Sequence, residues 1–219
     1  MPCCSPDDYR SIFGAKTVAR DARRYRRKGL TSSARWILER LTDDGVAGQS
    51  VLEIGGGVGG LQIELVEAGA SSAMNVEIID SYEDAARRLI AEHRVDDRIS
   101  RRIDDFAQGA VDVGPADIVV MHRVLCCYPD PDSLMGVACE HSRRRVAITL
   151  PRDTWWTKLA FAAMNTWLRV RRVAFRGYVH SIQGLHEVAA RRGFHAVDQH
   201  AGMFWTSIVL ACAEPDRSD

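Results

Sequence analysis

The stretch Val51-Leu52-Glu53-Ile54-Gly55-Gly56-Gly57-Val58-Gly59-Gly60 decides the fold. A short apolar run that ends in glycines predicts a buried strand, a tight turn and then a helix. Gly55, Gly57 and Gly59 let the backbone approach a bound ligand closely, and the amides that begin the next helix face that ligand. The spacing departs from G-x-G-x-x-G, which Gly60 completes only loosely.

Glu53 distinguishes this loop from a glycine-rich turn without a ligand, which is the alternative interpretation. Its carboxylate is expected inside a buried strand, two residues before the first glycine. Burying a charge is costly unless the charge has a partner. An ammonium group of a ligand, held directly or through water, would supply that partner. We therefore predict that Glu53, Gly55, Gly57 and Gly59 contact a cofactor.

A second acidic residue, Glu77, follows Glu53 by 24 residues, where the next parallel strand is expected to end. A carboxylate at that place can bind both hydroxyl groups of a ribose. Asp80 competes for this role, but Asp80-Ser81 is typical of a helix N-cap, so Glu77 is preferred. A solvated carboxylate at a strand end is the alternative for Glu77.

A third acidic motif, Asp104-Asp105-Phe106, follows the third expected strand. A carboxylate there can accept a hydrogen bond from the amino group of an adenine, with the Phe106 ring against the base. Asp105 is preferred because it immediately precedes the aromatic residue. A polar turn without a ligand is the alternative.

The chain after residue 50 alternates short apolar runs with helical patterns, which is typical of βαβ units. Strands are expected near 50–54, 72–78, 99–103, 116–121, 145–150, 195–200 and 204–213. Helices are expected near 9–27, 32–41, 60–68, 81–93, 132–142 and 182–192. Only three residues separate the last two strands, so these strands are expected to form an antiparallel hairpin.

These features together resemble the class I S-adenosylmethionine-dependent methyltransferases, over about residues 48–213. The resemblance implies an α/β fold with a Rossmann-like, seven-stranded, mostly parallel sheet, an antiparallel C-terminal hairpin and helices on both faces. It also implies S-adenosyl-L-methionine as the cofactor. The glycine loop and Glu53 would face its methionine moiety, Glu77 its ribose, and Asp105-Phe106 its adenine.

Two further strings, at residues 25–30 and 123–130, look like those of a group of uncharacterised bacterial methyltransferases. The N-terminal helices and the glycine loop also resemble the magnesium-protoporphyrin methyltransferases, from which no substrate is carried over. We expect methyl transfer to a small molecule, with oxygen as the favoured acceptor atom (O-methylation). A nucleic-acid methyltransferase that uses the basic N-terminus, and a non-catalytic S-adenosylmethionine-binding module, are the alternatives.

The reacting site is expected at His122-Arg123, the carboxyl end of the fourth strand, because open α/β sheets bind ligands there. His122 can deprotonate an acceptor hydroxyl, since its reference pKa is near neutrality. Alternatively, positioning alone drives transfer from a sulfonium. Arg123 either clamps a carboxylate of the cofactor or substrate, or forms a structural ion pair. Tyr25 and Tyr128 are assigned to the substrate pocket.

The domain organisation is expected to be an N-terminal helical cap (residues 1–47) and a methyltransferase domain (residues 48–219) with a cap insert at about 152–181. The insert is apolar on more than one helical face, which predicts a cover over a hydrophobic pocket. Plain core, a dimer face and an interfacial membrane helix are the alternatives. Trp155 and Trp156 are assigned to the substrate pocket, and His180 is the second candidate base.

Composition excludes several classes of protein. The chain has 219 residues, of which 46% are hydrophobic and 26% charged, so extensive disorder is excluded. The chain has only six cysteines, and four of them form the adjacent pairs Cys3-Cys4 and Cys126-Cys127, which excludes a disulfide scaffold. No metal site is expected. No apolar run is long enough to span a membrane, and the N-terminus does not resemble a signal peptide. A cytoplasmic monomer or homodimer is expected.

The net charge is zero, but basic residues are concentrated in two segments. Residues 16–40 contain nine basic residues against two acidic ones, and residues 152–176 contain six against one. Such segments attract phosphate, anionic lipid or a carboxylate-bearing substrate, or are simply solvated. No stable nucleic-acid partner is expected, because the chain lacks an Asn/Asp-Pro-Pro-Tyr-type motif for a flipped base.

Overall fold

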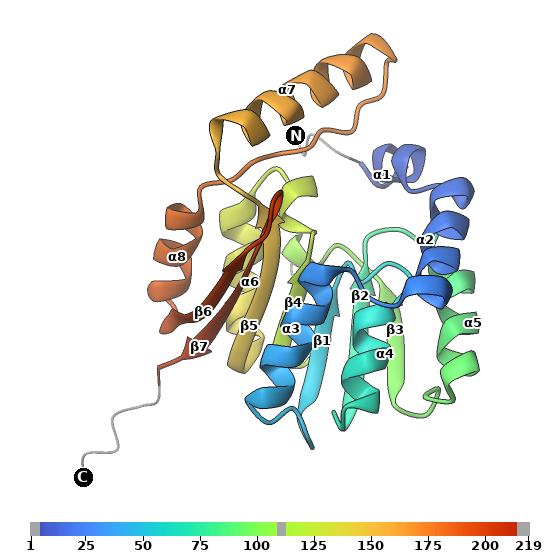
Figure 1. Ribbon diagram of the computed structural model, residues 1–219, viewed down its shortest axis with the longest axis vertical. Coiled ribbons are helices and arrows are strands. Elements are labelled where there is room, and N and C mark those ends of the chain that lie inside the picture. Colours follow the sequence, from blue (N-terminus) through green and yellow to red (C-terminus); the bar gives the residue numbers. More distant parts are fainter. Residues whose placement is uncertain (1–4, 109–112, 214–219) are drawn as a thin grey trace.

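The computed structural model describes residues 5–108 and 113–213, and Cys3 and Cys4 lie outside this part. Its centre is a seven-stranded sheet in the order β3-β2-β1-β4-β5-β7-β6 (Figure 1). The first five strands pair in parallel, while β7 is antiparallel to both β5 and β6. The predicted sheet and its antiparallel hairpin are therefore confirmed. The strands are β1 (Ser50–Ile54), β2 (Ser72–Glu77), β3 (Ile99–Ile103), β4 (Ala116–His122), β5 (Ser142–Pro151), β6 (Phe194–Ala201) and β7 (Trp205–Cys212).

Helices bury both faces of the sheet, as a parallel sheet requires. Alternate residues of β4 show this: Val119 and Met121 pack on one face, Ile118 and Val120 on the other. The helices of the first face are α6 (Pro131–Glu140) and α8 (Ile182–Ala190), and those of the second are α3 (Ser32–Asp43), α4 (Gly60–Glu67) and α5 (Glu83–His93). Since the order of the strands reverses between β1 and β4, which lie side by side in parallel, a ligand crevice is expected at the carboxyl ends of these two strands.

The N-terminal segment divides into two parts with different positions. The α3 helix is a structural layer of the sheet, because Ile37 and Leu41 are fully buried in the core. The preceding helices, α1 (Pro6–Ile12) and α2 (Ala15–Lys28), lie above the carboxyl edge of the sheet (Figure 1). One continuous helix was expected over residues 9–27. That expectation is wrong, because the chain turns at Gly14, which is the N-cap of α2.

Two other local expectations differ from the structure. Asp80 does not cap a helix: α5 has Tyr82 as its N-cap, and the Asp80 carboxylate instead accepts a hydrogen bond from Arg10 Nε at 3.1 Å. The strand β5 begins at Ser142 rather than at Arg145, because the chain passes from α6 into the sheet within a single residue, His141.

The insert after β5 forms α7 (Trp155–Val170), which stands away from the rest of the molecule in Figure 1. One side of the insert reaches the body: Leu168 and Phe175 pack with Tyr9 and Ile79 in a small separate core. Across the described ranges, no helix has both the length and the apolar character needed to cross a membrane.

Candidate active site

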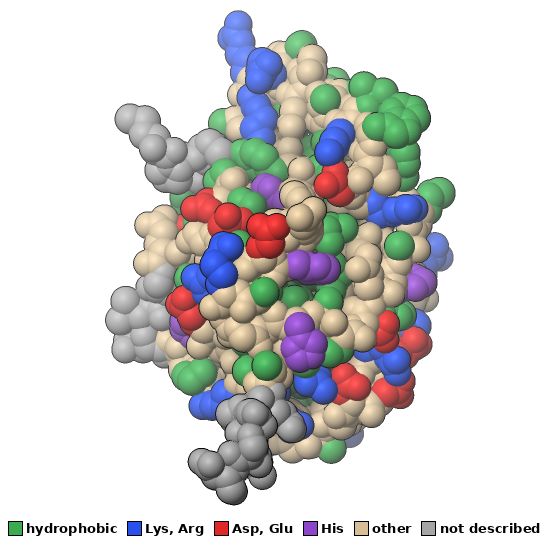
Figure 2. Space-filling view, turned by 90° about the vertical axis from the view of Figure 1, so that its left-hand side faces the viewer, with side chains coloured by type: hydrophobic (Ala, Val, Ile, Leu, Met, Phe, Trp, Pro, Cys, Tyr) green, Lys and Arg blue, Asp and Glu red, His purple; other side chains and the backbone are tan. Residues whose placement is uncertain are grey.

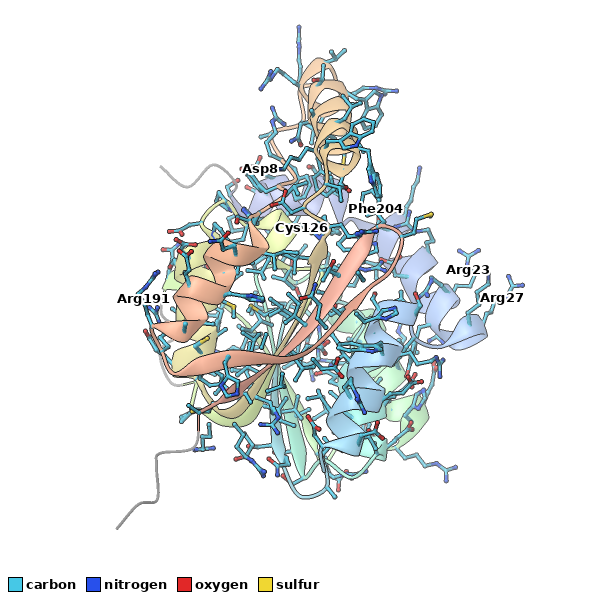
Figure 3. The ribbon with its side chains drawn as sticks, turned by 60° about the vertical axis from the view of Figure 1, so that its left-hand side comes forward. Asp8, Arg23, Arg27, Cys126, Arg191 and Phe204 are labelled. Carbon is cyan, nitrogen blue, oxygen red and sulfur yellow. The ribbon has the colours of Figure 1, made fainter. Side chains whose placement is uncertain are left out.

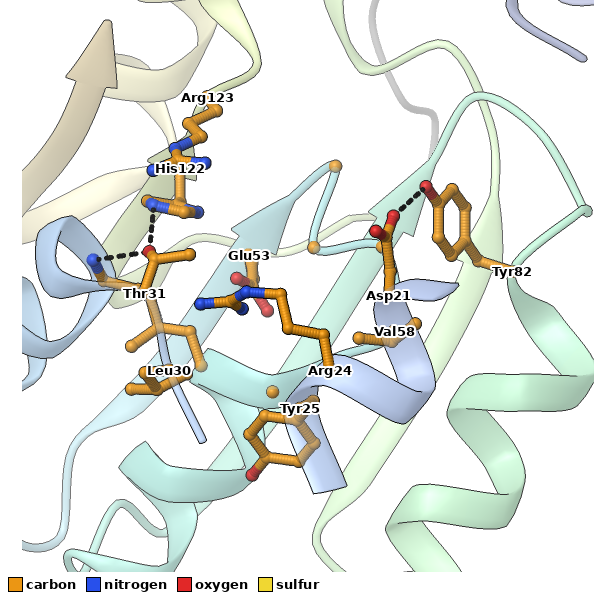
Figure 4. A pocket seen from close by; sticks show the side chains of 16 residues that line it. Asp21, Arg24, Tyr25, Leu30, Thr31, Glu53, Val58, Tyr82, His122 and Arg123 are labelled. Atoms are coloured by element: carbon orange, nitrogen blue, oxygen red, sulfur yellow. Dashed lines mark hydrogen bonds between the residues drawn. The ribbon is translucent and has the colours of Figure 1, made fainter. Parts of the chain in front are cut away.

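Two cavities open at the carboxyl ends of β1, β2 and β4, and both are lined by Gly55. We call them the glycine-loop cavity, of about 240 Å³, and the Glu77 cavity, of about 60 Å³. The glycine-loop cavity (Figure 4) is lined by Asp21, Arg24, Tyr25, Leu30, Thr31, Ala34, Glu53, Gly55, Gly56, Gly57, Val58, Gly60, Leu61, Tyr82, His122 and Arg123. The Glu77 cavity is lined by Tyr9, Ile54, Gly55, Val76, Glu77, Ile78, Asp104, Asp105, Phe106, Ala107, Val124, Cys127, Tyr128 and Leu134.

The glycine loop passes so close to its neighbours that side chains cannot fit. Gly55 has a φ of +66°, and a Cβ there would lie 2.6 Å from Val124 Cγ2. At Gly56, a Cβ would lie 2.4 Å from Glu53 Oε2. The buried Arg101 side chain supports the loop, since Nη2 donates to the Gly57 carbonyl at 3.1 Å and Nε pairs with Glu83 at 2.9 Å. The backbone between the two cavities is therefore held in place and left bare.

Glu53 is a buried carboxylate at the floor of the glycine-loop cavity. Its exposed fraction is 2%, and Oε2 has no hydrogen-bond partner among the described residues. Burial raises its pKa to about 7, which the positive charge of Arg101 partly opposes. A buried carboxylate with an unpartnered oxygen favours a bound cation. The position of Glu53 therefore fits the ammonium group that the sequence predicts.

Glu77 ends β2 and lines the second cavity. It is 5% exposed and accepts a hydrogen bond from the backbone N–H of Gly57. Burial raises its pKa to about 7, against the opposing effects of the Gly57 hydrogen bond and of Arg101. The competitor Asp80 lines neither cavity, and its side chain is 66% exposed.

Asp105 and Phe106 lie in the Glu77 cavity, at the turn η1 (Phe106–Gln108) that follows β3. The Asp105 carboxylate accepts hydrogen bonds from Ala107 N at 3.2 Å and Gln108 Nε2 at 2.8 Å. The Phe106 ring is 3% exposed and meets the His141 ring edge-on at 4.9 Å. Phe106 thus contributes a mostly covered ring to the cavity wall.

Tyr25 and Tyr128, both assigned to the substrate pocket, lie in different cavities. The Tyr25 ring forms part of the glycine-loop cavity and leaves no room for a Cβ at Gly60, 2.8 Å away. Tyr128 lies with Glu77 instead, and burial together with the nearby Asp105 charge raises its pKa to about 12. The structure therefore groups Tyr128 with Glu77 and Asp105.

His122 lies in the glycine-loop cavity at the end of β4. Its Nε2 is within hydrogen-bond distance of Thr31 Oγ1 (3.3 Å, Figure 4) and of Ser33 Oγ (3.0 Å), and both hydroxyls belong to the segment that begins α3. Burial, with smaller effects of Arg123 and Arg24, lowers the pKa of His122 to about 3. The imidazole is therefore neutral at physiological pH and is a weak base.

Arg123 also lines the glycine-loop cavity, and its guanidinium lies 4.3 Å from the centre of the Trp205 ring. Its Nη2 donates to Ser33 Oγ at 3.2 Å, and burial lowers its pKa. No carboxylate among the described residues forms an ion pair with it, so a structural ion pair is not found there. The guanidinium is positioned by a cation–π contact with Trp205 and not by an ion pair.

His180, Trp155 and Trp156 do not line either cavity. His180 Nε2 donates to the carbonyl oxygens of Leu125 (2.9 Å) and Tyr128 (3.0 Å), which fixes the turn after β4. Trp155 is 77% exposed, and the Trp156 ring packs on Phe204 at 5.7 Å. These three side chains therefore lie outside the site that the other residues form.

Several cavity residues were not predicted from the sequence. Arg24 extends from α2 over the cavity in Figure 4, and Asp21 on the same helix accepts a hydrogen bond from Tyr82 Oη at 3.0 Å. The basic run of α2 was visible in the sequence, but only the packing of α2 selects Arg24.

As for metals, the described residues include no group of three or more His, Cys, Asp or Glu side chains that could hold an ion.

The protein-family comparison identifies the family of the chain. A model described as a methyltransferase domain matches residues 22–199, which include most of the residues that line the two cavities and most of the sheet. The chain belongs to this methyltransferase family. The predicted resemblance to class I methyltransferases is thereby confirmed, and the cofactor expected from the sequence, S-adenosylmethionine, follows from it. No curated protein matches the sequence of this methyltransferase.

Solved structures share the methyltransferase fold at low sequence identity. Magnesium protoporphyrin IX methyltransferase from Synechocystis, with bound SAH, has a TM-score of 0.70 and 18% identity, and the match covers 94% of each chain. An O-methyltransferase family protein from Burkholderia thailandensis has a TM-score of 0.64 and 15% identity, over 82% of this chain and 56% of that one. The pyocyanin biosynthetic protein PhzM has a TM-score of 0.58 and 17% identity, over 86% and 61%.

Proposed function

We propose that this methyltransferase transfers a methyl group from S-adenosylmethionine to a small-molecule acceptor, with oxygen as the favoured atom. The observation that carries the proposal is the pair of cavities that meet at Gly55. One cavity holds groups suited to a nucleoside, and the other holds both a buried carboxylate with an unpartnered oxygen and a neutral histidine. This arrangement separates recognition of the cofactor's nucleoside from the cavity where its methionine part and the acceptor would meet.

The residues present fit the cofactor in both cavities. In the Glu77 cavity, Glu77 would bind the ribose hydroxyls, and Asp105 with Phe106 would contact the adenine. In the glycine-loop cavity, Glu53 would hold the methionine ammonium group. The bare backbone at Gly55 and Gly57 leaves room for the part of the cofactor that joins this group to the ribose. Arg123 and Arg24 are the cations available for a carboxylate.

The cofactor supplies an activated methyl on a sulfonium, and an in-line nucleophile at short range is then sufficient. We propose that this chain contributes mainly positioning. His122 is neutral, and its hydrogen-bonding neighbours Ser33 and Thr31 are hydroxyls, so these groups can orient an acceptor hydroxyl. Its low pKa argues against the general-base role that the sequence suggested. His180 is a positioning residue for the turn after β4.

The size of the glycine-loop cavity supports a small acceptor. Its volume of about 240 Å³ must hold the methionine part of the cofactor as well as the acceptor. The cavity is also covered from above by α2 and by the start of α3, since Asp21, Tyr25, Thr31 and Ala34 line it. A large folded substrate would have to displace these helices.

A nucleic-acid substrate is the second candidate, because α2 carries a basic groove. Arg20, Arg23, Arg24, Arg27 and Lys28 line this groove, and Figure 3 shows Arg23 and Arg27 pointing away from the body of the molecule. Such a surface is suited to phosphate groups. We place this function second because the groove is exposed and shares only Arg24 with the glycine-loop cavity.

Transfer of a labelled methyl group distinguishes the two candidates. The protein is incubated with methyl-labelled S-adenosylmethionine and either a small-metabolite extract or total RNA, with Glu77→Ala as the inactive control. Label in the small-molecule fraction supports the proposal, and label in RNA supports the second candidate. Bound cofactor with transfer to neither fraction would favour a non-catalytic binding module.

The free thiols of Cys126, Cys127, Cys139 and Cys212 support a reducing compartment such as the cytoplasm.

A further inference from the structure

The outer side of α7 is an apolar stripe that the rest of the described chain leaves uncovered. Trp155, Leu159, Trp167 and Val170 recur at helical spacing and are 77%, 62%, 56% and 77% exposed. Figure 2 shows apolar and basic side chains gathered at the end of the molecule where α7 lies. An exposed contiguous apolar patch marks an interaction surface, because it otherwise costs free energy in water.

The opposite side of α7 is attached to the rest of the molecule, and this attachment keeps the apolar stripe facing outward. Leu168 is 3% exposed in the small core with Phe175 and Tyr9. The Asn165 side chain forms two hydrogen bonds to the backbone of Gly177: Nδ2 donates to the carbonyl at 2.8 Å and Oδ1 accepts from the N–H at 2.9 Å. The helix therefore cannot turn its apolar stripe inward without breaking these contacts. The stripe also contributes nothing to the two cavities.

The charge around the stripe indicates what covers it. Lys158, Arg169, Arg171 and Arg172 lie on or immediately after α7, and no acidic residue occurs from residue 154 to residue 186. Arg171 lies 5.1 Å from the centre of the Trp167 ring, so cation and aromatic ring are presented together. A helix with tryptophans on one side and basic residues beside them suits an anionic lipid surface.

A second copy of the chain fits this surface less well. Two α7 helices packed against each other would bring their basic residues together, and neither helix has a carboxylate to neutralise them. The acid nearest in sequence, Asp153, is already paired with Lys158 at 2.6 Å. The charges therefore oppose self-association through α7 and favour a negatively charged partner.

We propose that α7 is an interfacial helix that binds the protein to the surface of an anionic bilayer. Trp155, Leu159, Trp167 and Val170 enter the boundary between headgroups and acyl chains, while Arg169 and Arg172 contact the headgroups. The helix lies in the plane of the interface and does not span the bilayer. This proposal stands independently of methyl transfer, because no residue of α7 lines the candidate active site.

Co-sedimentation with lipid vesicles tests the proposal on the full chain. The expected result is binding to vesicles of phosphatidylcholine mixed with phosphatidylglycerol, little binding to phosphatidylcholine alone, and weaker binding as salt is added. The double variant Trp155→Ser/Trp167→Ser should bind at least about tenfold more weakly. The double variant Arg169→Gln/Arg172→Gln should bind about 30-fold more weakly.

Matched controls exclude non-specific effects. Val197→Ser removes an exposed apolar residue of β6, and Arg143→Gln/Arg144→Gln removes a basic pair at the opposite end of β5, so both should bind like the parent protein. Circular dichroism checks that each variant is folded. Absence of binding to anionic vesicles, or undiminished binding of the tryptophan variant, overturns the proposal. So does a dimer in size-exclusion chromatography that the tryptophan variant abolishes, because the stripe would then bind a second copy.

Discussion

The Glu77 carboxylate at the end of β2 accepts a hydrogen bond from the backbone N–H of Gly57, in the loop that follows β1. The acidic end of β2 and the glycine loop are therefore one unit, in which the loop helps to position the carboxylate expected at the ribose. Arg101 reinforces the unit from β3 through the Gly57 carbonyl. A change in any of these groups is expected to alter cofactor affinity before it alters the fold.

Cofactor affinity should rise with pH near neutrality. Burial raises the pKa values of Glu53 and Glu77 to about 7, so both carboxyls are protonated in the free protein at lower pH. Only the ionised forms carry the negative charge that attracts an ammonium group and accept hydrogen bonds from a diol through both oxygens. Calorimetry with S-adenosylhomocysteine, which lacks the sulfonium charge, should show affinity increasing about tenfold or more from about pH 6 to pH 8. An affinity that stays constant over this range contradicts the assignment.

The ionised Glu53 carboxylate should lower the free energy of unfolding of the cofactor-free protein, although it favours cofactor binding. Its pKa is raised in the folded protein from 4.5 to about 7, so the folded state holds a proton that the unfolded state releases as pH rises. Stability therefore falls between about pH 4.5 and pH 7, and the full cost, up to about 3 kcal/mol, is present at pH 8. Glu53→Gln should stabilise the cofactor-free protein at pH 8 and have little effect at pH 4.

Urea unfolding at the two pH values measures this effect. Glu39→Gln, at an exposed position on α3, is the matched control and should change stability little at either pH. The Glu53→Gln variant should also bind S-adenosylmethionine more weakly, since it has no charge for the ammonium group. If Glu53→Gln destabilises the protein as much at pH 8 as at pH 4, the buried carboxylate is not costly and the argument fails.

Two glycines separate backbone strain from crowding at the site. Gly55 and Gly48 both have a positive φ, +66° and +76°, so alanine costs about 1 kcal/mol or more at either position. Only at Gly55 would the new Cβ collide with Val124, a residue of the Glu77 cavity. Gly55→Ala should weaken S-adenosylhomocysteine binding measured by calorimetry, while Gly48→Ala should leave it unchanged. Equal affinities for the two variants would remove Gly55 from the site.

Turnover should not depend on ionisation of His122. With a pKa of about 3, its imidazole is already neutral throughout the physiological range. The pH dependence of kcat, measured at saturating cofactor so that Glu53 and Glu77 do not contribute, should show no limb near the ordinary histidine value. His122→Gln should retain turnover within about tenfold, whereas loss of a general base costs about 10²–10⁴-fold. A limb that disappears in His122→Gln would establish His122 as the base.

The features set by local pattern could be predicted from the sequence. Apolar alternation and glycine placement predicted the parallel strands and the ligand site at their carboxyl ends, because parallel strands present these ends at one edge of a sheet. For this reason Glu53, Glu77 and Asp105, which are far apart in the sequence, line two adjoining cavities. The three-residue turn between β6 and β7 likewise predicted the hairpin.

Features that depend on tertiary packing could not be predicted. The helical spacing of α7 does not say which side meets the body, so Trp155 was assigned to a pocket although it is exposed. His180 was a candidate base because of its position in the chain, but two carbonyl oxygens occupy its Nε2. Arg24 enters the site only because α2 packs over the glycine loop. In each case the deciding partner lies far away in sequence.

Calorimetric titration of S-adenosylhomocysteine into the parent protein, Glu77→Ala and Asp80→Ala is the most direct test of the central claim. Glu77→Ala removes a buried carboxylate expected at the ribose, so affinity should fall by about 1.5–3 kcal/mol, which is more than tenfold. Asp80→Ala removes an exposed carboxylate three residues away that pairs with Arg10, and it should leave affinity unchanged. Unchanged affinity in Glu77→Ala, or a loss in Asp80→Ala instead, would contradict the account.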